Sequence, residues 1–422
     1  MQYYDPILYM STEENPNTMG ITATLTEPVD GKILQFAIEY LRERFPYFYV
    51  KAAVKGNDLV PVPNPLPVTV RNTWEPISLY SRDANYHAMA FKYEDMRLAV
   101  EISHSLTDGI GFLPYFKSIL YVYLSRKTGM HFDSTGFRLP GDMIPDSEIG
   151  DPFPGIDLDS VEKPLYQKPL INDFYRLSET QSNGEINRNA IYLRLPEKEV
   201  MRYCRENDGS PNVLLSVLMA RAVRKIDKET EKTIVSLVAI DHKAQLGNHD
   251  NYRLFANTAY IDFQKEHAGD DILKMCTVAR GQLMLQAQPE NTLFFLKTRK
   301  EGFERMSQTP LQMKVDMLKK VVGMSRATVG VSYANSRSFG PLDPYIRELY
   351  MLAEPSASDV LCEVACLNNS FFLTMSSSFA SEEYYRAFFD ELISSGIHYE
   401  VMRQERYELC GVRYDGIENV CL

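Results

Sequence analysis

The chain has 422 residues, of which 45% are hydrophobic and 24% charged, and this composition is that of a globular protein rather than a disordered or collagenous one. At roughly 150 residues per domain, the length predicts two or three domains. The formal net charge of -11 at pH 7 opposes unspecific binding to nucleic acid or to an anionic membrane surface.

Cysteine usage and hydropathy favour a cytoplasmic protein. The six cysteines are few for this length and no two have the CxxC spacing, so we expect reduced thiols. The first basic residue is Lys32, and the N-terminal residues therefore lack the basic start of a secretory signal. No apolar run approaches the 18 or so residues that a membrane-spanning helix needs.

The first part of the chain predicts a helix, two strands and a second helix. Apolar residues recur at helical spacing through 30–45, with Asp30 as the expected N-cap. Segments 88–93 and 97–104 predict two strands joined by a short turn, and the second strand alternates apolar and other residues. The mostly apolar run 109–126 then predicts a buried helix.

Prolines and acidic residues punctuate 133–185, which we interpret as an ordered crossover between two halves. The second half predicts further strands at 189–196, 233–241, 255–263 and 327–334, and helices from about 197, at 212–227 and within 270–324. It ends with a hairpin of 360–367 and 370–379 around Asn368 and Asn369, followed by a helix over 381–396. Because both halves mix helices and strands, the fold class is predicted to be α+β.

The clearest candidate for chemistry is His104-Ser105-Leu106-Thr107-Asp108-Gly109, which lies between the second strand and the buried helix. An imidazole titrates near pH 6.5, so a rigidly held His104 could take a proton from a hydroxyl or an amine at neutral pH. Asp108 could cap the helix and pair with a cation, and Gly109 could let another group approach the turn. The spacing alone favours the alternative of a half-buried histidine beside an ordinary capping aspartate.

Other residues give weaker signals. Gly330-Val331-Ser332-Tyr333-Ala334 nearly matches the nucleophile elbow of serine hydrolases, with His398 as the sole later base, but it lacks the last glycine and also fits a structural strand. Three further groups of residues are best interpreted as structural. We interpret His242 and His249 as loop residues, Cys362 and Cys366 as buried thiols, and the run Lys297, Arg299 and Lys300 as a solvated helix face. The sequence contains no Walker A motif, no HExxH and no G-x-G-x-x-G after a strand.

The block VEISHSLTDGIGFLPYFKSILYVYL resembles the HxxxDG acyltransferases, a superfamily that includes chloramphenicol acetyltransferase, the plant BAHD acyltransferases and the condensation domains of peptide synthetases. The preceding ATLTEPVDGKILQFAIEYLRERFPYFYVKA is similar to the first strand and helix of bacterial alcohol acetyltransferase-like proteins. VGVSYANSRSFGPLDPYIREL resembles the crossover strand of the second half, and SFFLTMSSSF resembles the C-terminal hairpin. The resemblance covers nearly all of the chain.

The resemblance implies two chloramphenicol-acetyltransferase-like subdomains, 1–170 and 171–422, each a mixed sheet with helices, with a tunnel between them and a crossover strand near 327–335. His104 would act in the tunnel as general base for direct transfer of a short acyl group, such as acetyl, from a CoA thioester to an alcohol or amine. Acyl-CoA would then be a co-substrate, and neither a metal nor a permanently bound cofactor is expected.

The resemblance also implies roles for two residues of the second half. Many relatives carry an arginine after the strand that VSLVAIDHKA resembles, where it pairs with the motif aspartate. Here that position is Lys243, which we therefore expect as the partner of Asp108. Ser332, on the expected crossover strand, is a candidate to stabilise the oxyanion, beside backbone N–H groups near Gly109.

Alternatives from other classes remain open at this point. The same fold could use an acyl group bound to a carrier protein in polyketide, lipid or peptide synthesis, or it could bind a ligand without catalysis. A hydrolase built on Ser332 is a further alternative. Because one chain carries both halves, it can form the tunnel internally, and we expect a monomer with small-molecule substrates.

Overall fold

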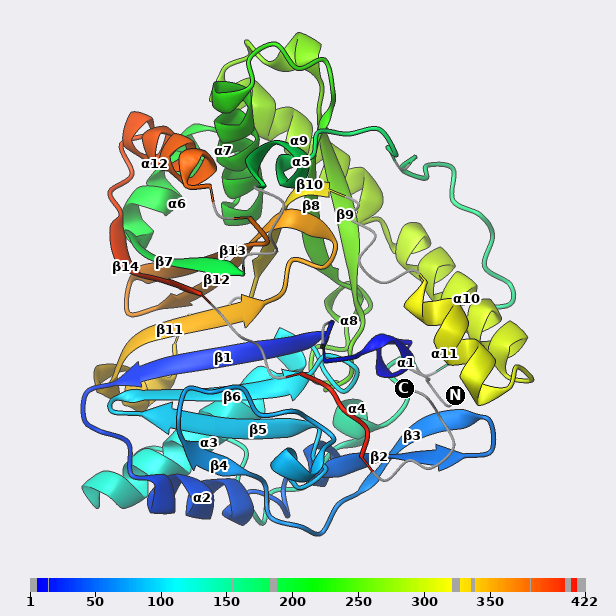
Figure 1. The fold of residues 1–422 in the computed structure, drawn as a ribbon, viewed down its shortest axis with the longest axis vertical. Helices are drawn as coiled ribbons and strands as arrows, with labels where there is room; N and C mark the ends of the chain where they lie inside the picture. Colours follow the sequence, from blue (N-terminus) through cyan, green and yellow to red (C-terminus); the bar gives the residue numbers. More distant parts are fainter. Residues whose placement is uncertain are drawn as a thin grey trace.

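The computed structural model describes residues 6–415 except 14, 154, 170, 183–187, 321–326, 335–337, 380 and 407–410. Two β-sheets with helices packed against them form two lobes, one above the other in Figure 1. No helix in the described part of the chain combines the length and apolar character needed to cross a bilayer. The described cysteines are free and buried, as expected, and they are Cys204, Cys276, Cys362 and Cys366; Cys410 and Cys421 lie outside the described residues.

The lower lobe of Figure 1 is built on a five-stranded sheet in the order β11-β1-β6-β5-β4. Its strands are β1 (Thr18–Leu25), β4 (Val70–Asn72), β5 (Met89–Glu94), β6 (Arg97–Ser103) and β11 (Ile346–Ala353). Helices α2 (Gly31–Tyr40) and α3 (Gly109–Thr128) share one apolar core with the side chains of β6 at Leu98, Val100 and Ile102. Glu101 and Ser103 occupy the opposite face of β6, because successive strand residues point to opposite sides.

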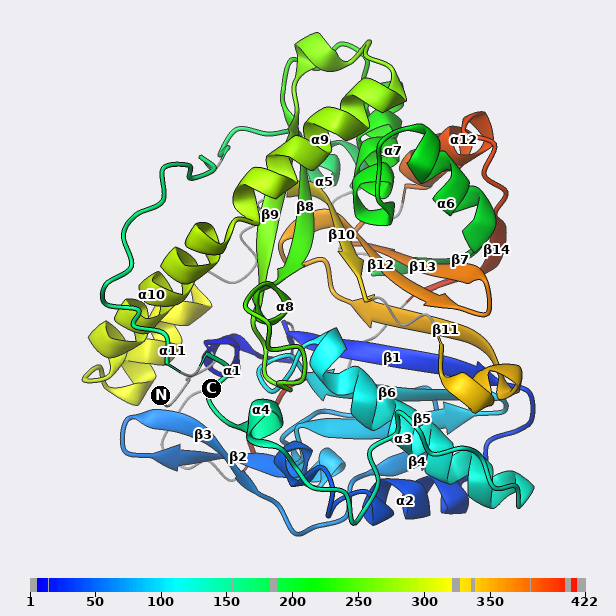
Figure 2. The same cartoon turned by 180° about the vertical axis from the view of Figure 1, so that it is seen from behind.

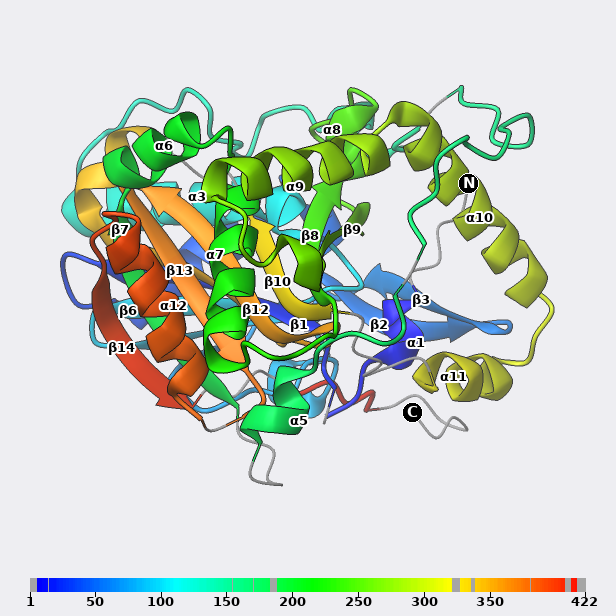
Figure 3. The same cartoon turned by 90° about the horizontal axis from the view of Figure 1, so that it is seen from above.

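The upper lobe is built on a seven-stranded sheet in the order β14-β7-β13-β12-β10-β8-β9. Its strands are β7 (Asn189–Pro196), β8 (Ile234–Asp241), β9 (Ala256–Phe263), β10 (Ala327–Tyr333), β12 (Ser358–Leu367), β13 (Ser370–Ser377) and β14 (Glu400–Arg406). Strand β10 runs parallel to both of its neighbours, and the other pairs are antiparallel. Helices α6 (Glu197–Glu206), α7 (Pro211–Ile226), α9 (Ile272–Gln286) and α12 (Glu383–Ser394) cover one face of this sheet, as Figure 3 shows from above.

The strand that crosses between the lobes is β11 rather than the one expected near 327–335. Residues 327–333 form β10, which lies inside the upper sheet between β12 and β8. Strand β11 leaves the second half of the chain and pairs antiparallel with β1 over seven positions of the lower sheet. The expectation fails because a strand sequence carries no mark of the sheet it will join, and β10 and β11 follow each other closely.

Shorter elements connect and flank the lobes. They are α1 (Ile7–Met10), α4 (Asp146–Ile149), α5 (Leu177–Gln181), α8 (His242–Gln245), α10 (Pro289–Met306), α11 (Leu311–Lys319) and the hairpin of β2 (Val50–Lys55) with β3 (Asp58–Pro63). Figure 2 shows α8 at the boundary between the lobes, close to where α3 begins. Helix α11 belongs to the second half of the chain but packs against the lower lobe, where Lys314 forms an ion pair with Asp58.

Local signals in the sequence act as expected at both ends of the chain. The Asp30 carboxylate accepts hydrogen bonds from the N–H groups of Lys32 and Ile33 and so starts α2. Asn368 and Asn369 have φ of 49° and 58°, the left-handed pair that a two-residue hairpin requires, and they join β12 to β13.

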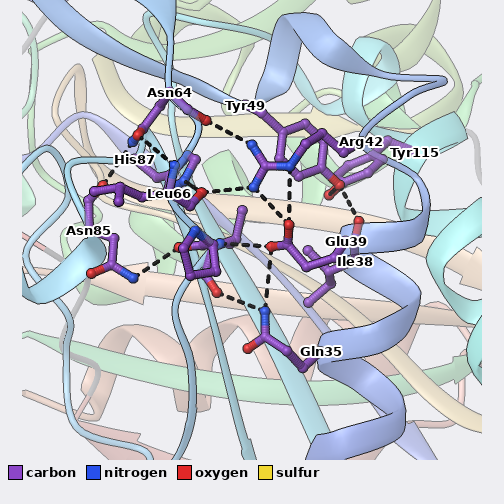
Figure 4. A network of polar contacts seen from close by, with 12 residues as sticks. Gln35, Ile38, Glu39, Arg42, Tyr49, Asn64, Leu66, Asn85, His87 and Tyr115 are labelled. Atoms are coloured by element: carbon purple, nitrogen blue, oxygen red, sulfur yellow. Dashed lines mark hydrogen bonds and ion pairs between the residues drawn. The ribbon is translucent and has the colours of Figure 1, made fainter.

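A polar network fixes α2 and α3 beneath the lower sheet (Figure 4). Arg42, which follows α2, donates to Glu39 in the last turn of that helix and to the backbone carbonyls of Asn64 and Leu66. The hydroxyls of Tyr49 and Tyr115, the latter on α3, lie 2.7 Å apart. The network therefore helps to fix α3, the helix that begins at Asp108, within the lower lobe.

Candidate functional site

The His104 imidazole is held in one orientation directly after β6. Its Nδ1 lies 2.8 Å from the carbonyl oxygen of Thr107, and its backbone N–H donates to the carbonyl of Asn17. Because a carbonyl oxygen can only accept, Nδ1 carries the proton of the neutral ring. The other ring nitrogen, Nε2, is then unprotonated and able to accept a proton.

The Asp108 carboxylate points into the protein and organises the turn that carries His104. One oxygen accepts from the N–H of Gly111 at 2.7 Å, which makes Asp108 the N-cap of α3. The other oxygen accepts from Lys243 Nζ at 2.7 Å and from the N–H of Phe255 at 3.3 Å. Asp108 therefore links the first turn of α3 to the upper lobe.

Lys243 lies on α8, and its side chain is completely buried. Its ammonium group donates to Asp108, to the carbonyl of Asn251 at 3.0 Å and to the carbonyl of Arg253 at 2.8 Å. An ammonium has three protons, so the three acceptors match its donors. The three acceptors are thus arranged for the tetrahedral ammonium of a lysine and not for the planar guanidinium of an arginine.

The backbone that contributes these carbonyls packs directly against the His104 turn. The Thr107 hydroxyl donates to the carbonyl of Tyr252 at 2.6 Å. A Cβ at Gly111 would lie 2.3 Å from that same carbonyl oxygen, so the close approach requires glycine there. A Cβ at Gly109 would meet no protein atom nearer than 3.7 Å, so the close approach of another group to Gly109 stays a prediction. Gly109 faces a cavity.

This cavity has a volume of about 170 Å³ and is lined by residues of both lobes. His104, Gly109 and Ile110 line it from the lower lobe, and Ala239 and Ser332 are among the residues that line it from the upper lobe. The remainder of its wall is largely apolar and includes side chains of β1 and β11. His104 and Ser332 are thus brought to one space, while Lys243 acts from behind its wall.

Ser332 lies in this wall beside a glutamate, Glu363, that belongs to no recognisable sequence motif. Ser332 on β10 is in register with Glu363 on the parallel strand β12, and its hydroxyl donates to the Glu363 carboxylate. Burial raises the pKa of Glu363 to about 7, although the Ser332 hydrogen bond opposes this shift. The signal that could have identified Glu363 from the sequence is its charge within the apolar run VLCEVACL. Asp241 lines the cavity too, and burial raises the pKa of its carboxyl.

The other residues considered earlier lie elsewhere. His398 is exposed and contacts Glu199, so it offers no base to Ser332. His242 is buried against Thr292, whereas His249 is exposed. Lys297 and Lys300 on α10 bind the crossover segment at Asp159 and Val161, and Arg299 lies over the Phe255 ring.

No family model and no curated protein matches this sequence. Among solved structures, F. sporotrichioides TRI101 complexed with coenzyme A and T-2 is 12% identical and aligns over 93% of this chain and 98% of its own, with a TM-score of 0.59. The TRI3 trichothecene 15-O-acetyltransferase of Fusarium sporotrichioides aligns over 93% and 92% at 9% identity, with a TM-score of 0.60. Polyketide synthase associated protein 5 of Mycobacterium tuberculosis aligns over 89% and 93% at 13% identity, with a TM-score of 0.56.

The chain has the two-lobed fold of these proteins. The expected α+β fold of two chloramphenicol-acetyltransferase-like halves is therefore confirmed. At such low identities the likeness establishes the fold and leaves the reaction to be argued from the site.

Proposed function

We propose that this protein transfers a short acyl group, acetyl in the simplest case, from a CoA thioester to an alcohol or amine in the cavity between the lobes. The observation that carries the proposal is the orientation of His104, whose Nδ1 is committed to the Thr107 carbonyl in a cavity shared by both lobes. The crystallised complex of TRI101 with coenzyme A supports the choice of donor. The HSLTDG turn supports the resemblance to the HxxxDG acyltransferases.

In the proposed reaction, His104 Nε2 takes the proton of the acceptor hydroxyl or amine as the acceptor attacks the thioester carbonyl. The tetrahedral intermediate then collapses with cleavage of the carbon–sulfur bond. The departing CoA thiolate receives the proton from the imidazolium, and the neutral imidazole is restored. No covalent acyl-enzyme forms. Asp108 and Lys243 are positioning residues in this scheme, because they hold the turn and do not contact substrate.

The oxyanion of the intermediate needs hydrogen-bond donors near His104. Gly109 and Ile110 line the cavity at the first turn of α3, where backbone N–H groups and the helix dipole favour negative charge. Ser332 is the second candidate, but an ionised Glu363 takes its single hydroxyl proton. We therefore assign the oxyanion to the start of α3.

Ser332→Ala separates these two assignments. We expect a loss of less than about tenfold in kcat, because the principal donors remain, whereas deletion of a main oxyanion donor costs roughly 10²- to 10³-fold. A loss in the larger range, with the KM for the acyl donor unchanged, would return the oxyanion role to Ser332.

A thiol-release assay tests the proposal as a whole. Purified protein is mixed with acetyl-CoA and a panel of alcohols and amines, and acylated products are identified by mass spectrometry. We expect acceptor-dependent release of CoA that His104→Ala abolishes and that His131→Ala, at an exposed histidine, leaves unchanged. Product formation by His104→Ala at the unmodified rate would refute it.

A carrier-protein donor is the second candidate, since the fold is shared with polyketide synthase associated protein 5 and with the epimerization domain of tyrocidine synthetase B. The same assay with an acyl group loaded on a carrier protein distinguishes the donors. Transfer from the carrier but not from CoA would favour this candidate. Ligand binding without transfer from either donor would favour a non-catalytic protein.

A further inference from the structure

The cavity wall carries negative groups without a basic side chain. Asp108, Asp241 and Glu363 all line it, and no lysine or arginine does so among the residues that the structure describes. Asp108 is neutralised by Lys243, and one oxygen of Asp241 accepts the N–H of Lys243 at the start of α8. These contacts leave Asp241 and Glu363 without an ion pair among the described residues, and Glu363 is the more deeply buried of the two.

Glu363 differs in this respect from the other buried carboxylates. It is 9% exposed, yet no ion pair joins it to a described lysine or arginine. Each of the other five buried carboxylates among the described residues has a lysine or arginine nitrogen within 3.4 Å, and they are Glu101, Asp108, Glu148, Asp359 and Glu391. A buried charge without a partner is unfavourable. The fold thus pairs such groups elsewhere and leaves this one facing the cavity.

We propose that Glu363 binds a positively charged group of the acceptor, so that the preferred acceptors are ammonium-bearing alcohols. The proposal rests on the transfer reaction proposed above. The cation must belong to the acceptor, because the phosphates of CoA are anionic and its thioester arm is uncharged. A bound ammonium supplies the missing partner in a poorly solvated space, where opposite charges attract more strongly than in water.

Ser332 supports this binding site by position. Its hydroxyl donates to the Glu363 carboxylate from the neighbouring strand and thereby holds the carboxylate toward the cavity. Because burial raises the pKa of Glu363 to about 7, the uncharged form is accessible at neutral pH when no cation is bound, and an ammonium favours the charged form. Glu363 would therefore discriminate between charged and uncharged acceptors of the same shape.

Matched acceptors test this discrimination directly. Trimethylammonium alcohols with chains of two to six carbons are compared with their tert-butyl isosteres, which have the same shape without the charge, in the acetyl-CoA assay. We expect the charged member to have the higher kcat/KM by about 10- to 100-fold, because opposite charges attract in a poorly solvated space. In Glu363→Gln this preference disappears, mainly through a higher KM for the charged alcohol.

Controls separate failure of this inference from failure of the reaction. Glu229→Gln, at an exposed glutamate, should keep the full preference. Equal use of both isosteres, or a preference that survives Glu363→Gln, would overturn the inference and leave the acyltransferase intact. If neither alcohol is acylated, calorimetric titration of the same pair into protein with bound CoA replaces kinetics. Tighter binding of the ammonium compound that depends on Glu363 then supports the inference, and equal or absent binding of both overturns it.

Discussion

Replacement of Lys243 by alanine removes the cation beneath the His104 turn, and the structure allows its cost to be worked out. The Lys243 side chain is fully buried and that of Asp108 is 7% exposed, so water reaches neither group freely. Alanine leaves the Asp108 carboxylate with two backbone donors and no counter-charge. It also removes the donor from two backbone carbonyls that face the turn.

Loss of one partner from a buried ion pair typically costs about 3–5 kcal/mol, because the remaining charge stays buried. We expect Lys243→Ala to lower the free energy of unfolding by about 4 kcal/mol. Lys265→Ala is a matched control, because its pair with Glu231 is partly exposed, at 30% and 83% of the two side chains, and worth about 0–1 kcal/mol.

Urea unfolding of the single and double variants measures these costs. The double variant Lys243→Met with Asp108→Asn should be less destabilised than the sum of its single variants, because it leaves no uncompensated charge. A loss of less than 1 kcal/mol in Lys243→Ala, or strict additivity in the cycle, would refute the view that this pair holds the turn.

Two further substitutions make distinct predictions. Burial raises the pKa of Glu363 from 4.5 to about 7. Between pH 4.5 and about pH 7 the folded protein therefore keeps a proton that the unfolded chain loses, and the free energy of unfolding falls as the pH rises through this range. Glu363→Gln should therefore be more stable than the unmodified protein by up to about 3 kcal/mol at pH 8, with no such gain at pH 4, in urea titrations; an equal difference at both pH values would contradict this. Gly111→Ala should lower the free energy of unfolding by about 2 kcal/mol or more through its clash with the Tyr252 carbonyl, whereas Gly281→Ala, with open space around it, should not destabilise α9; equal thermal midpoints for both would contradict the argument.

Local signals explain which elements were predictable. The Asp30 cap, the two asparagines of the hairpin and the helix after Asp108 depend on contacts within a few residues, and the sequence shows them directly. Strand β11 was missed as a separate strand because its partner β1 lies more than 300 residues earlier in the chain. Strand β14 was missed since it is a mostly charged edge strand without an apolar alternation.

The candidate site likewise combines residues that a local motif predicts with residues that only long-range contacts bring together. His104, Asp108 and Gly109 stand in one short motif, so the sequence alone could suggest them. The contact between Asp108 and Lys243 spans 135 positions, and it was expected only through the family resemblance. Glu363 gains its place from the parallel register of β10 and β12, which no local pattern encodes.

The most direct test of the account is the single-turnover rate of acyl transfer by His104→Ala, with binding of CoA measured on the same preparation. The account predicts a rate lower by roughly 10²- to 10⁴-fold, the contribution of a general base, together with an unchanged Kd for CoA and an unchanged thermal midpoint. A rate within a few-fold of the unmodified protein, with the variant folded and CoA bound, would contradict the assignment of His104 as the base.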